Sequence, residues 1–155
     1  MKIKRATEDD TTQIVDIFQQ ARESALPYLP ILHTNQEDLA YFGAAVEKTT
    51  VYVMKDEDRL VAFCAFRTDW VDHLYVLPVY ARRGIGCALV EKAKAAHPRL
   101  QLWVFQRNEA AAAFYKAIGF TLVKLTDGAD NEEREPDALY QWPEPFDQIH
   151  VIDVE

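Results

Sequence analysis

Residues 71–93 read VDHLYVLPVYARRGIGCALVEKA, and the order of elements in this stretch decides the fold. The apolar run at its start is typical of a buried strand, and Pro78 ends that strand. After a turn with two glycines, apolar side chains recur at helical spacing over residues 85–96. The first turn of such a helix has free backbone N–H groups and the positive end of the helix dipole, which together favour a bound phosphate. Arg82 and Arg83 add positive charge at the same turn, in a chain that is otherwise acidic.

Besides a phosphate site, the two glycines of this turn are compatible with a nucleotide-binding loop or with a turn that has only a packing role. A nucleotide-binding loop is disfavoured, because the P-loop pattern GxxxxGK[ST] is absent and Leu89 occupies the third glycine position of the dinucleotide fingerprint GxGxxG. A tight turn that only packs the helix on the sheet would also use small residues at Gly84 and Gly86. The pattern by itself therefore leaves a phosphate site and a packing turn open, and it disfavours ATP or NAD.

Strand-like segments precede the glycine turn at residues 50–55, 60–67 and 70–77. Turn-forming residues separate these segments, which predicts an antiparallel meander. Periodicity and turn residues predict the other elements: a strand at 2–6, helices at about 8–25 and 36–46, a strand at 100–105, a helix at 109–118, and closing strands at 120–125 and 138–142. The alternation of helix and strand in the second half implies a parallel crossover, so the expected sheet is mixed and the class is α+β or α/β.

The composition indicates an ordinary globular domain. The chain has 155 residues, of which 49% are hydrophobic and 27% charged. Its 17 Lys and Arg against 25 Asp and Glu give a net charge of −8, which disfavours nucleic-acid binding and suits cationic partners, although many proteins are acidic without such a partner. Two cysteines, and no apolar run long enough for a signal peptide or a membrane span, predict a reducing, cytoplasmic setting without membrane contact.

The stretch quoted above, followed by NEAAAAFYKAIGF at residues 108–120, resembles the GNAT superfamily of N-acetyltransferases. The first segment is similar to the central motif of that family and the second to its carboxy-terminal helix motif. The resemblance covers residues 1–142 and implies a single N-acetyltransferase domain of the α+β, three-layer GNAT fold. It implies a mixed, mostly antiparallel sheet of about seven strands flanked by about four helices. Residues 143–155 are left as a tail of unassigned role.

The resemblance also implies an activity. It predicts an acetyl-CoA-dependent N-acetyltransferase that needs no metal and acts as a monomer or homodimer. The acceptor is a primary amine of a small molecule or a protein, which attacks the thioester directly in a ternary complex. A catalytically silent, CoA-binding regulatory module of the same fold is the alternative.

The resemblance assigns cofactor binding to main-chain groups of the strand, to the glycine turn and to the second motif. In the family this turn wraps the pyrophosphate, the strand backbone holds the pantetheine arm, and an N–H group, here that of Val76, polarises the thioester carbonyl. The implied cofactor-binding residues are Leu74, Tyr75, Val76, Arg82, Arg83, Gly84, Ile85, Gly86, Cys87, Ala88, Asn108 and Tyr115. One departure is Ala81, which stands where the family usually has Gln or Arg. Asn108 is equally well placed to cap the helix that follows it.

Catalysis is assigned to Tyr115 and Asp72. Tyr115 matches the family tyrosine that acts as general acid to the leaving thiolate. Asp72 lies two residues before Leu74 and is the candidate general base, whereas strand alternation places His73 on the opposite face. Trp70 occupies the position where some protein-acetylating members carry a catalytic glutamate. An ordinary strand surface is the alternative for Asp72 and His73.

Four residues are candidates for acceptor binding. They lie in the proline-broken loop after the first helix, at the start of the central strand, and in the acidic segment between the last two strands: Tyr28, His33, Trp70 and Glu133. The acidic segment, residues 132–137, is expected to attract a cationic amine or to be a solvated turn.

Overall fold

The structure is a computed structural model that describes residues 1–143, so the predicted tail at 143–155 lies almost wholly outside the described residues. Within residues 1–143 there are seven strands and four α-helices. Contacts divide the chain into two compact units, residues 1–97 and the residues from Pro98 onward. That residues 1–142 act as one domain stays a prediction. No helix in the described range is both long and apolar enough to cross a membrane.

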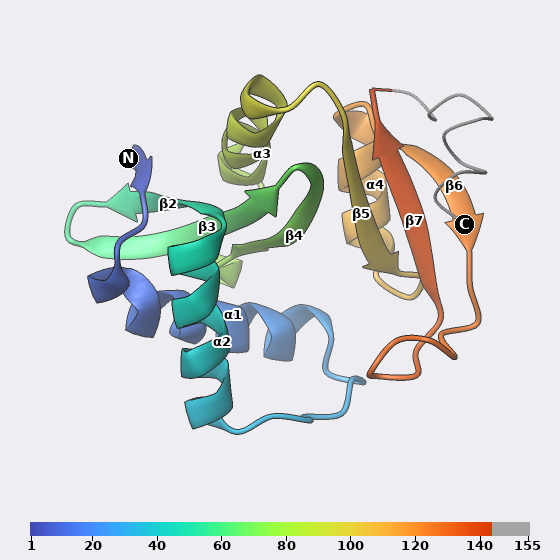
Figure 1. The fold of residues 1–155 in the computed structure, drawn as a ribbon, viewed down its shortest axis with the longest axis horizontal. Coiled ribbons are helices and arrows are strands. Elements are labelled where there is room, and N and C mark those ends of the chain that lie inside the picture. Colours follow the sequence, from blue (N-terminus) through green and yellow to red (C-terminus); the bar gives the residue numbers. More distant parts are fainter. Residues whose placement is uncertain (144–155) are drawn as a thin grey trace. The chain divides into compact units, whose positions relative to one another are not determined.

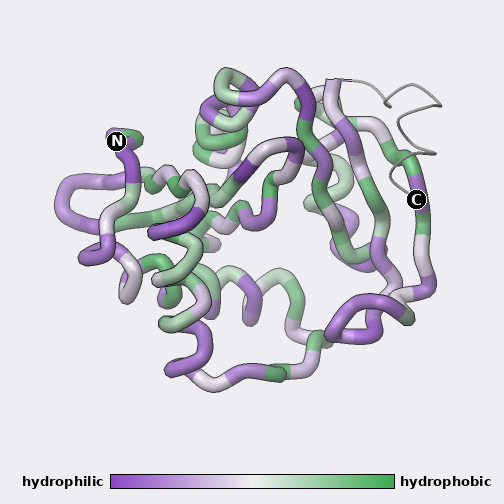
Figure 2. Tube along the Cα trace, viewed as in Figure 1, coloured by the Kyte–Doolittle hydropathy of each residue, from purple (hydrophilic) through white to green (hydrophobic). Residues whose placement is uncertain are grey.

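The first unit contains an antiparallel meander, as the sequence predicts. Its strands are β1 (Lys2–Arg5), β2 (Thr50–Asp56), β3 (Arg59–Arg67) and β4 (Asp69–Val76), each paired antiparallel with the next. The turn between β2 and β3 is strongly hydrophilic, while residues 60–66 of β3 are buried throughout (Figure 2). Burial of β3 on both faces makes it the centre of this unit's core.

Helices cover both faces of this sheet (Figure 1). The helices α1 (Thr11–Ala25) and α2 (Asn35–Lys48) lie on one face, and α3 (Ile85–Ala96) lies on the other. Side chains of β3 pack against the helices on both faces of the sheet. The Phe63 ring lies 5.5 Å from the Phe42 ring of α2, and the Phe66 ring lies 5.8 Å from the His97 ring at the end of α3. Two short 3₁₀ helices, at Glu8–Asp10 and Pro78–Tyr80, are not expected from the sequence.

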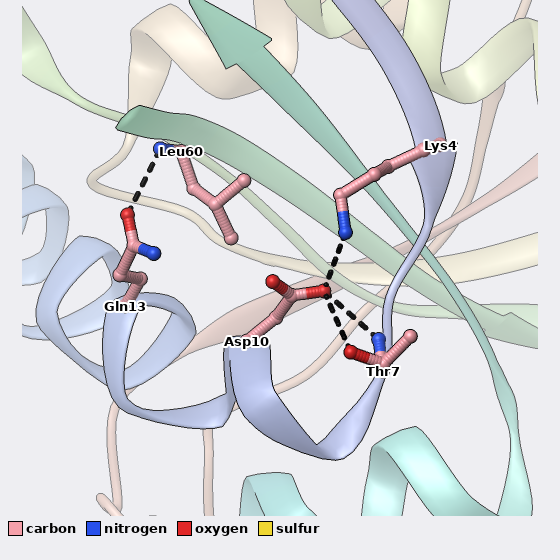
Figure 3. Close-up of polar contacts among 5 residues, drawn as sticks. All are labelled: Lys4, Thr7, Asp10, Gln13 and Leu60. Atoms are coloured by element: carbon pink, nitrogen blue, oxygen red, sulfur yellow. Dashed lines mark hydrogen bonds and ion pairs between the residues drawn. The ribbon is translucent and has the colours of Figure 1, made fainter. Parts of the chain in front are cut away.

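A carboxylate fixes the corner where β1 enters α1 (Figure 3). Asp10 is only 8% exposed, and one of its oxygens accepts hydrogen bonds from Lys4 Nζ and from the Thr7 N–H, both at 2.9 Å. Burial alone would raise the pKa of Asp10, but these hydrogen bonds and the lysine charge lower it overall. Nearby, the Leu60 N–H donates to Gln13 Oε1 at 3.0 Å and ties α1 to the start of β3.

Replacing Asp10 by Asn is expected to lower the free energy of unfolding at pH 7 by about 1–3 kcal/mol, since the charge-assisted bonds are lost. Because the folded-state pKa is depressed, the stabilisation by Asp10 is complete above its unfolded value of about 3.9 and is lost as pH falls through the folded value. Urea unfolding should therefore show a difference between the two proteins that shrinks toward pH 3. The exposed neighbour Asp9, changed to Asn, is the control, and an equal loss there would contradict the role of Asp10.

The second unit is a three-stranded antiparallel sheet with one helix. Its elements are β5 (Leu100–Phe105), α4 (Glu109–Ala117), β6 (Thr121–Leu125) and β7 (Asp137–Trp142), and β7 lies between β5 and β6. The loop between β6 and β7 is hydrophilic (Figure 2), and hydrogen bonds among its own residues and to Arg107 stabilise it. Asn131 Nδ2 donates to the carbonyl of Glu135 at 2.7 Å, and Arg107 forms two hydrogen bonds with the Glu135 carboxylate.

Candidate active site

The glycine turn presents an uncapped helix N-terminus. Arg82 and Gly84 have φ values of 63° and 79°, and Gly84 is the N-cap residue of α3. A Cβ on Gly84 would have no atom within 4 Å, so the glycine is needed for its backbone angle rather than for space. Since glycine has no side chain to accept the first N–H groups of the helix, these groups are left to a ligand or to water.

Charge at this turn is favourable to an anion. The first turn of α3 carries no acidic residue, and the side chains of Arg82 and Arg83 are exposed. The Arg83 guanidinium lies 4.9 Å above the Tyr80 ring and donates to the Val79 carbonyl at 3.3 Å. Tyr80 in turn donates its hydroxyl hydrogen to Asp56 Oδ2 at 2.7 Å, which ties the start of the turn to the end of β2. The turn therefore combines positive charge with directed N–H groups, as a phosphate or pyrophosphate site requires.

The β4 residues assigned to the pantetheine arm, Leu74–Val76, are the last three residues of the strand. Tyr75 pairs with Phe63 and Val76 with Ala62 of β3, so one side of the β4 backbone is occupied. The backbone groups on the other side of β4 do not pair with β3. The side chain of Tyr75 packs on the α1 face, with its ring 5.2 Å from Phe18. This arrangement fits main-chain binding by β4, which stays a prediction.

A β-bulge changes the predicted orientation of Asp72 and His73. In the pairing of β3 with β4, Ala65 is opposite His73 and Phe66 is opposite Val71, so Asp72 is the extra residue. The prediction that His73 and Asp72 face opposite sides is therefore wrong, since both line one pocket of about 310 Å³ between α2 and the ends of β3 and β4. The lining residues are Tyr41, Ala44, Ala45, Lys48, Thr49, Ala65, Arg67, Asp72 and His73.

Asp72, the predicted general base, is engaged by an arginine. Its two carboxylate oxygens accept hydrogen bonds from Arg67 Nε at 2.9 Å and Arg67 Nη2 at 3.1 Å. The same guanidinium lies 5.6 Å from the centre of the Trp70 ring, so the structure brings the predicted residues Trp70 and Asp72 together through Arg67. The assignment of Asp72 as base stays a prediction.

His73 has a partner that sequence reasoning did not find. The Tyr41 hydroxyl lies 2.7 Å from His73 Nε2, and the two rings are in edge-to-face contact. Burial lowers the pKa of His73 to about 4, against the opposing charge of Asp72, so the imidazole is neutral at physiological pH. Nothing in the sequence around Tyr41 distinguishes it from Phe42, the other aromatic residue of that helix, as a partner of His73.

The remaining catalytic candidate, Tyr115, lies in the second unit. Tyr115 is 9% exposed, and its ring packs 5.0 Å from Phe114 and 5.5 Å from Phe120. Asn108 is the N-cap residue of α4, where its Oδ1 accepts a hydrogen bond from the Ala111 N–H at 3.2 Å. The structure thus bears out the capping interpretation of Asn108, and a contact with the cofactor stays a prediction.

Changing Asn108 to Ala is expected to lower the free energy of unfolding by about 1 kcal/mol, because the first turn of α4 loses its cap. Changing it to Ser keeps a capping oxygen and should restore most of that stability. If Asn108 also contacts acetyl-CoA, the Ser variant will recover its melting temperature but not its affinity, measured by calorimetric titration with acetyl-CoA. Full recovery of both by Ser would leave only the capping role.

Two of the acceptor candidates lie in the connection between α1 and α2, and they are not among the lining residues of the α2–β4 pocket. Tyr28 is half-buried there, and the exposed His33 has Nδ1 3.9 Å from Glu37 Oε2. Glu133 lines a different pocket, of about 450 Å³, in the second unit. That pocket also contains Trp103, which is 47% exposed.

The acidic segment between β6 and β7 is only partly a solvated turn. Glu135 is bound to Arg107, which lowers the pKa of that carboxyl, and Asp137 is held by Thr126 and Asn131. These two carboxylates organise the loop, whereas Glu132 is exposed. Among residues 1–143, no group of three or more His, Cys, Asp or Glu side chains is arranged to hold a metal ion.

Comparisons with known proteins agree with this arrangement. The profile described as "Acetyltransferase (GNAT) domain" matches residues 47–122. The peptidyl-lysine N-acetyltransferase YiaC of Escherichia coli strain K12 is 34% identical over 142 residues, which span 91% of this chain and 96% of that relative.

Solved structures share the fold over most of the chain. Apo YjaB from Escherichia coli matches with a TM-score of 0.75 at 22% identity, over 91% of this chain and 96% of that one. The PaiA N-acetyltransferase of Thermoplasma acidophilum, solved in complex with coenzyme A, matches with a TM-score of 0.73 at 14% identity, over 90% and 96%. YiaC is matched almost from end to end at 34% identity, and the two solved structures share the fold of this chain. The chain therefore belongs to the GNAT family of acetyltransferases and has the α+β fold of that family.

Proposed function

We propose that this enzyme transfers the acetyl group of acetyl-CoA to the side-chain amine of a protein lysine, by direct attack in a ternary complex. The observation that carries the donor assignment is the uncapped N-terminus of α3, reached through a turn with two left-handed residues and flanked by Arg82 and Arg83. The acceptor assignment is supported by the similarity to YiaC, which is a peptidyl-lysine N-acetyltransferase. A small-molecule amine is the second candidate, since the pockets of the two units have room for a small molecule.

The donor would be held by main-chain groups rather than by side chains. The N–H groups of Ile85, Gly86 and Cys87, at the start of α3, would bind the pyrophosphate. Main-chain groups of β4 at Leu74–Val76 that do not pair with β3 would align the pantetheine arm by strand-like hydrogen bonds. Backbone binding of this kind explains how the enzyme can bind the donor with Ala81 in place of the usual Gln or Arg. The N–H groups point at the ligand without help from a side chain at that position.

The chemical step needs an oriented amine, a polarised carbonyl and a proton donor. The neutral amine nitrogen attacks the thioester carbonyl carbon while the Val76 N–H stabilises the negative charge that develops on the oxygen. The carbon–sulfur bond then breaks, and Tyr115 gives its hydroxyl proton to the departing thiolate, whose thiol has a pKa of about 8.5. The surplus proton of the amine goes to a base, for which Asp72 is the candidate, or directly to water, and water restores the proton of Tyr115.

The experiment is to follow release of the CoA thiol with acetyl-CoA and a panel of amines, and to locate the added acetyl group by mass spectrometry. The panel contains a lysine peptide, the same peptide with that lysine replaced by Arg, a peptide with only an N-terminal amine, and free polyamines. Acetylation of the lysine alone supports the proposal. Turnover on the polyamines but not on the lysine peptide would assign a small-molecule acceptor. Tight binding of acetyl-CoA without turnover on any amine would contradict the proposal and favour a silent CoA-binding module.

A further inference from the structure

The pocket between α2 and the start of β4 is built around two polar pairs. Alanines at positions 44, 45 and 65 form its walls and leave about 310 Å³ open. Arg67 and Asp72 form one pair, and Tyr41 and His73 form the other. Asp72 reaches this pocket only because the bulge in β4 interrupts the alternation of side chains.

The direction of the Tyr41–His73 hydrogen bond follows from the chemistry of the two groups. Burial raises the pKa of the Tyr41 hydroxyl, so that it keeps its proton, and the same cause keeps the His73 imidazole neutral. The phenol is the stronger acid of the two neutral partners, and with the His73 proton on Nδ1 the Tyr41 hydroxyl donates and His73 Nε2 accepts. The lone pairs of the Tyr41 oxygen then remain available, on a residue that is 55% exposed and lines the pocket.

We propose that the Tyr41 oxygen, held by His73, accepts a hydrogen bond from an N–H of the acceptor amine and so directs the amine lone pair toward the thioester. Tyr41 is then an acceptor-binding residue, and His73 is a positioning residue that acts through it. This inference rests on the proposed transfer to an amine.

The charges that line the pocket favour a neutral amine over an ammonium group. Arg67 is neutralised by Asp72 at a distance of 2.9 Å, and Lys48 of α2 adds a further positive charge to the lining. A positive charge nearby lowers the pKa of an entering amine, which increases the fraction able to attack. Tyr41 and His73, both neutral, offer an acceptor oxygen without a negative charge that would favour the protonated form.

The test compares four single variants in steady-state kinetics with acetyl-CoA and a lysine peptide. Tyr41→Phe removes the acceptor oxygen and is expected to lower kcat/KM for the peptide about tenfold or more, with KM for acetyl-CoA unchanged. His73→Leu removes the partner of the hydroxyl and should give a loss of similar size. His73→Gln offers a carbonyl oxygen in its place and should recover most of the activity. Tyr52→Phe is the matched control on the α3 face, where Tyr52 stacks on Phe66, and it should leave both constants unchanged.

Each alternative result has a distinct meaning. Wild-type kinetics for Tyr41→Phe would overturn the inference and leave the proposed function standing. A parallel loss of acetyl-CoA affinity or of melting temperature in Tyr41→Phe and both His73 variants would assign the pair to the fold, and would overturn the inference as well. If the wild-type enzyme acetylates no amine, the proposed function fails first and the inference falls with it.

Discussion

Changing Tyr115 to Phe is expected to lower kcat for acetyl transfer about a hundredfold, with little change in the affinity for acetyl-CoA. A positioned general acid contributes about 10²–10⁴-fold to rate, and phenylalanine has no proton to give to the departing thiolate. The ring itself is retained, so its packing against Phe114 and Phe120 in the second unit should persist. The measurements are single-turnover rates at saturating acetyl-CoA, together with calorimetric titration of the donor.

A second buried tyrosine of the same unit provides the control for this prediction. Tyr140 of β7 is buried, and its change to Phe removes a hydroxyl group without touching the assigned acid. The rate of Tyr140→Phe should stay near that of the wild-type enzyme. If Tyr115→Phe retains the wild-type rate, Tyr115 is not the acid. If it loses donor affinity in proportion to rate, its role is in binding.

Changing Cys87 to Asp is expected to weaken acetyl-CoA binding about a hundredfold without destabilising the protein. Cys87 is the third residue of α3, and an acidic side chain in the first turn of a helix is favourable to the helix itself. The same carboxylate would repel a pyrophosphate and compete with it for the N–H groups, and two unit charges 4 Å apart near a protein surface interact by about 4 kcal/mol. Stability and binding should therefore change in opposite directions.

Cys87→Ser is the control, since serine is similar in size and carries no charge. Its dissociation constant for acetyl-CoA should stay within a few-fold of the wild-type value. A Cys87→Asp protein that melts at or above the wild-type temperature and binds CoA weakly would support a pyrophosphate site at α3. Unchanged binding in that variant would remove the helix N-terminus from the donor site and return the turn to the packing interpretation.

Most of the secondary structure was predictable because local patterns agree with the final packing. Residues 100–105 have the apolar run of a strand, and β5 spans Leu100–Phe105. Pro98 and Gly119 also mark helix ends, since α3 ends at Ala96 and the positive-φ residue Gly119 follows α4 closely. The position of β7 between β5 and β6 was not predictable, because the order of strands in a sheet depends on contacts between segments far apart in sequence.

The residues of the candidate site likewise fall into those that local sequence predicts and those that depend on long-range contacts. The glycine turn, the positive charge beside it and the cap at Asn108 are local features, and the structure places the turn and the cap as their residue types suggest. Asp72 and His73 are different, because strand alternation assigned them to opposite faces and a bulge put them in one pocket. Pairing of Asp72 with Arg67 across the hairpin is likewise a tertiary fact.

The sequence alone determined the family, the order of elements and the place where an anionic donor can bind, because these depend on residue types that are close together along the chain. Only the tertiary structure decided the partners of the polar groups in the first unit. Tyr41 and His73 are 32 positions apart, and their 2.7 Å contact exists because α2 packs against β4 at His73, where the Phe42 ring also lies 5.1 Å from the imidazole. The chemistry of those two side chains is set by burial and by that single neighbour, and neither can be read from local sequence.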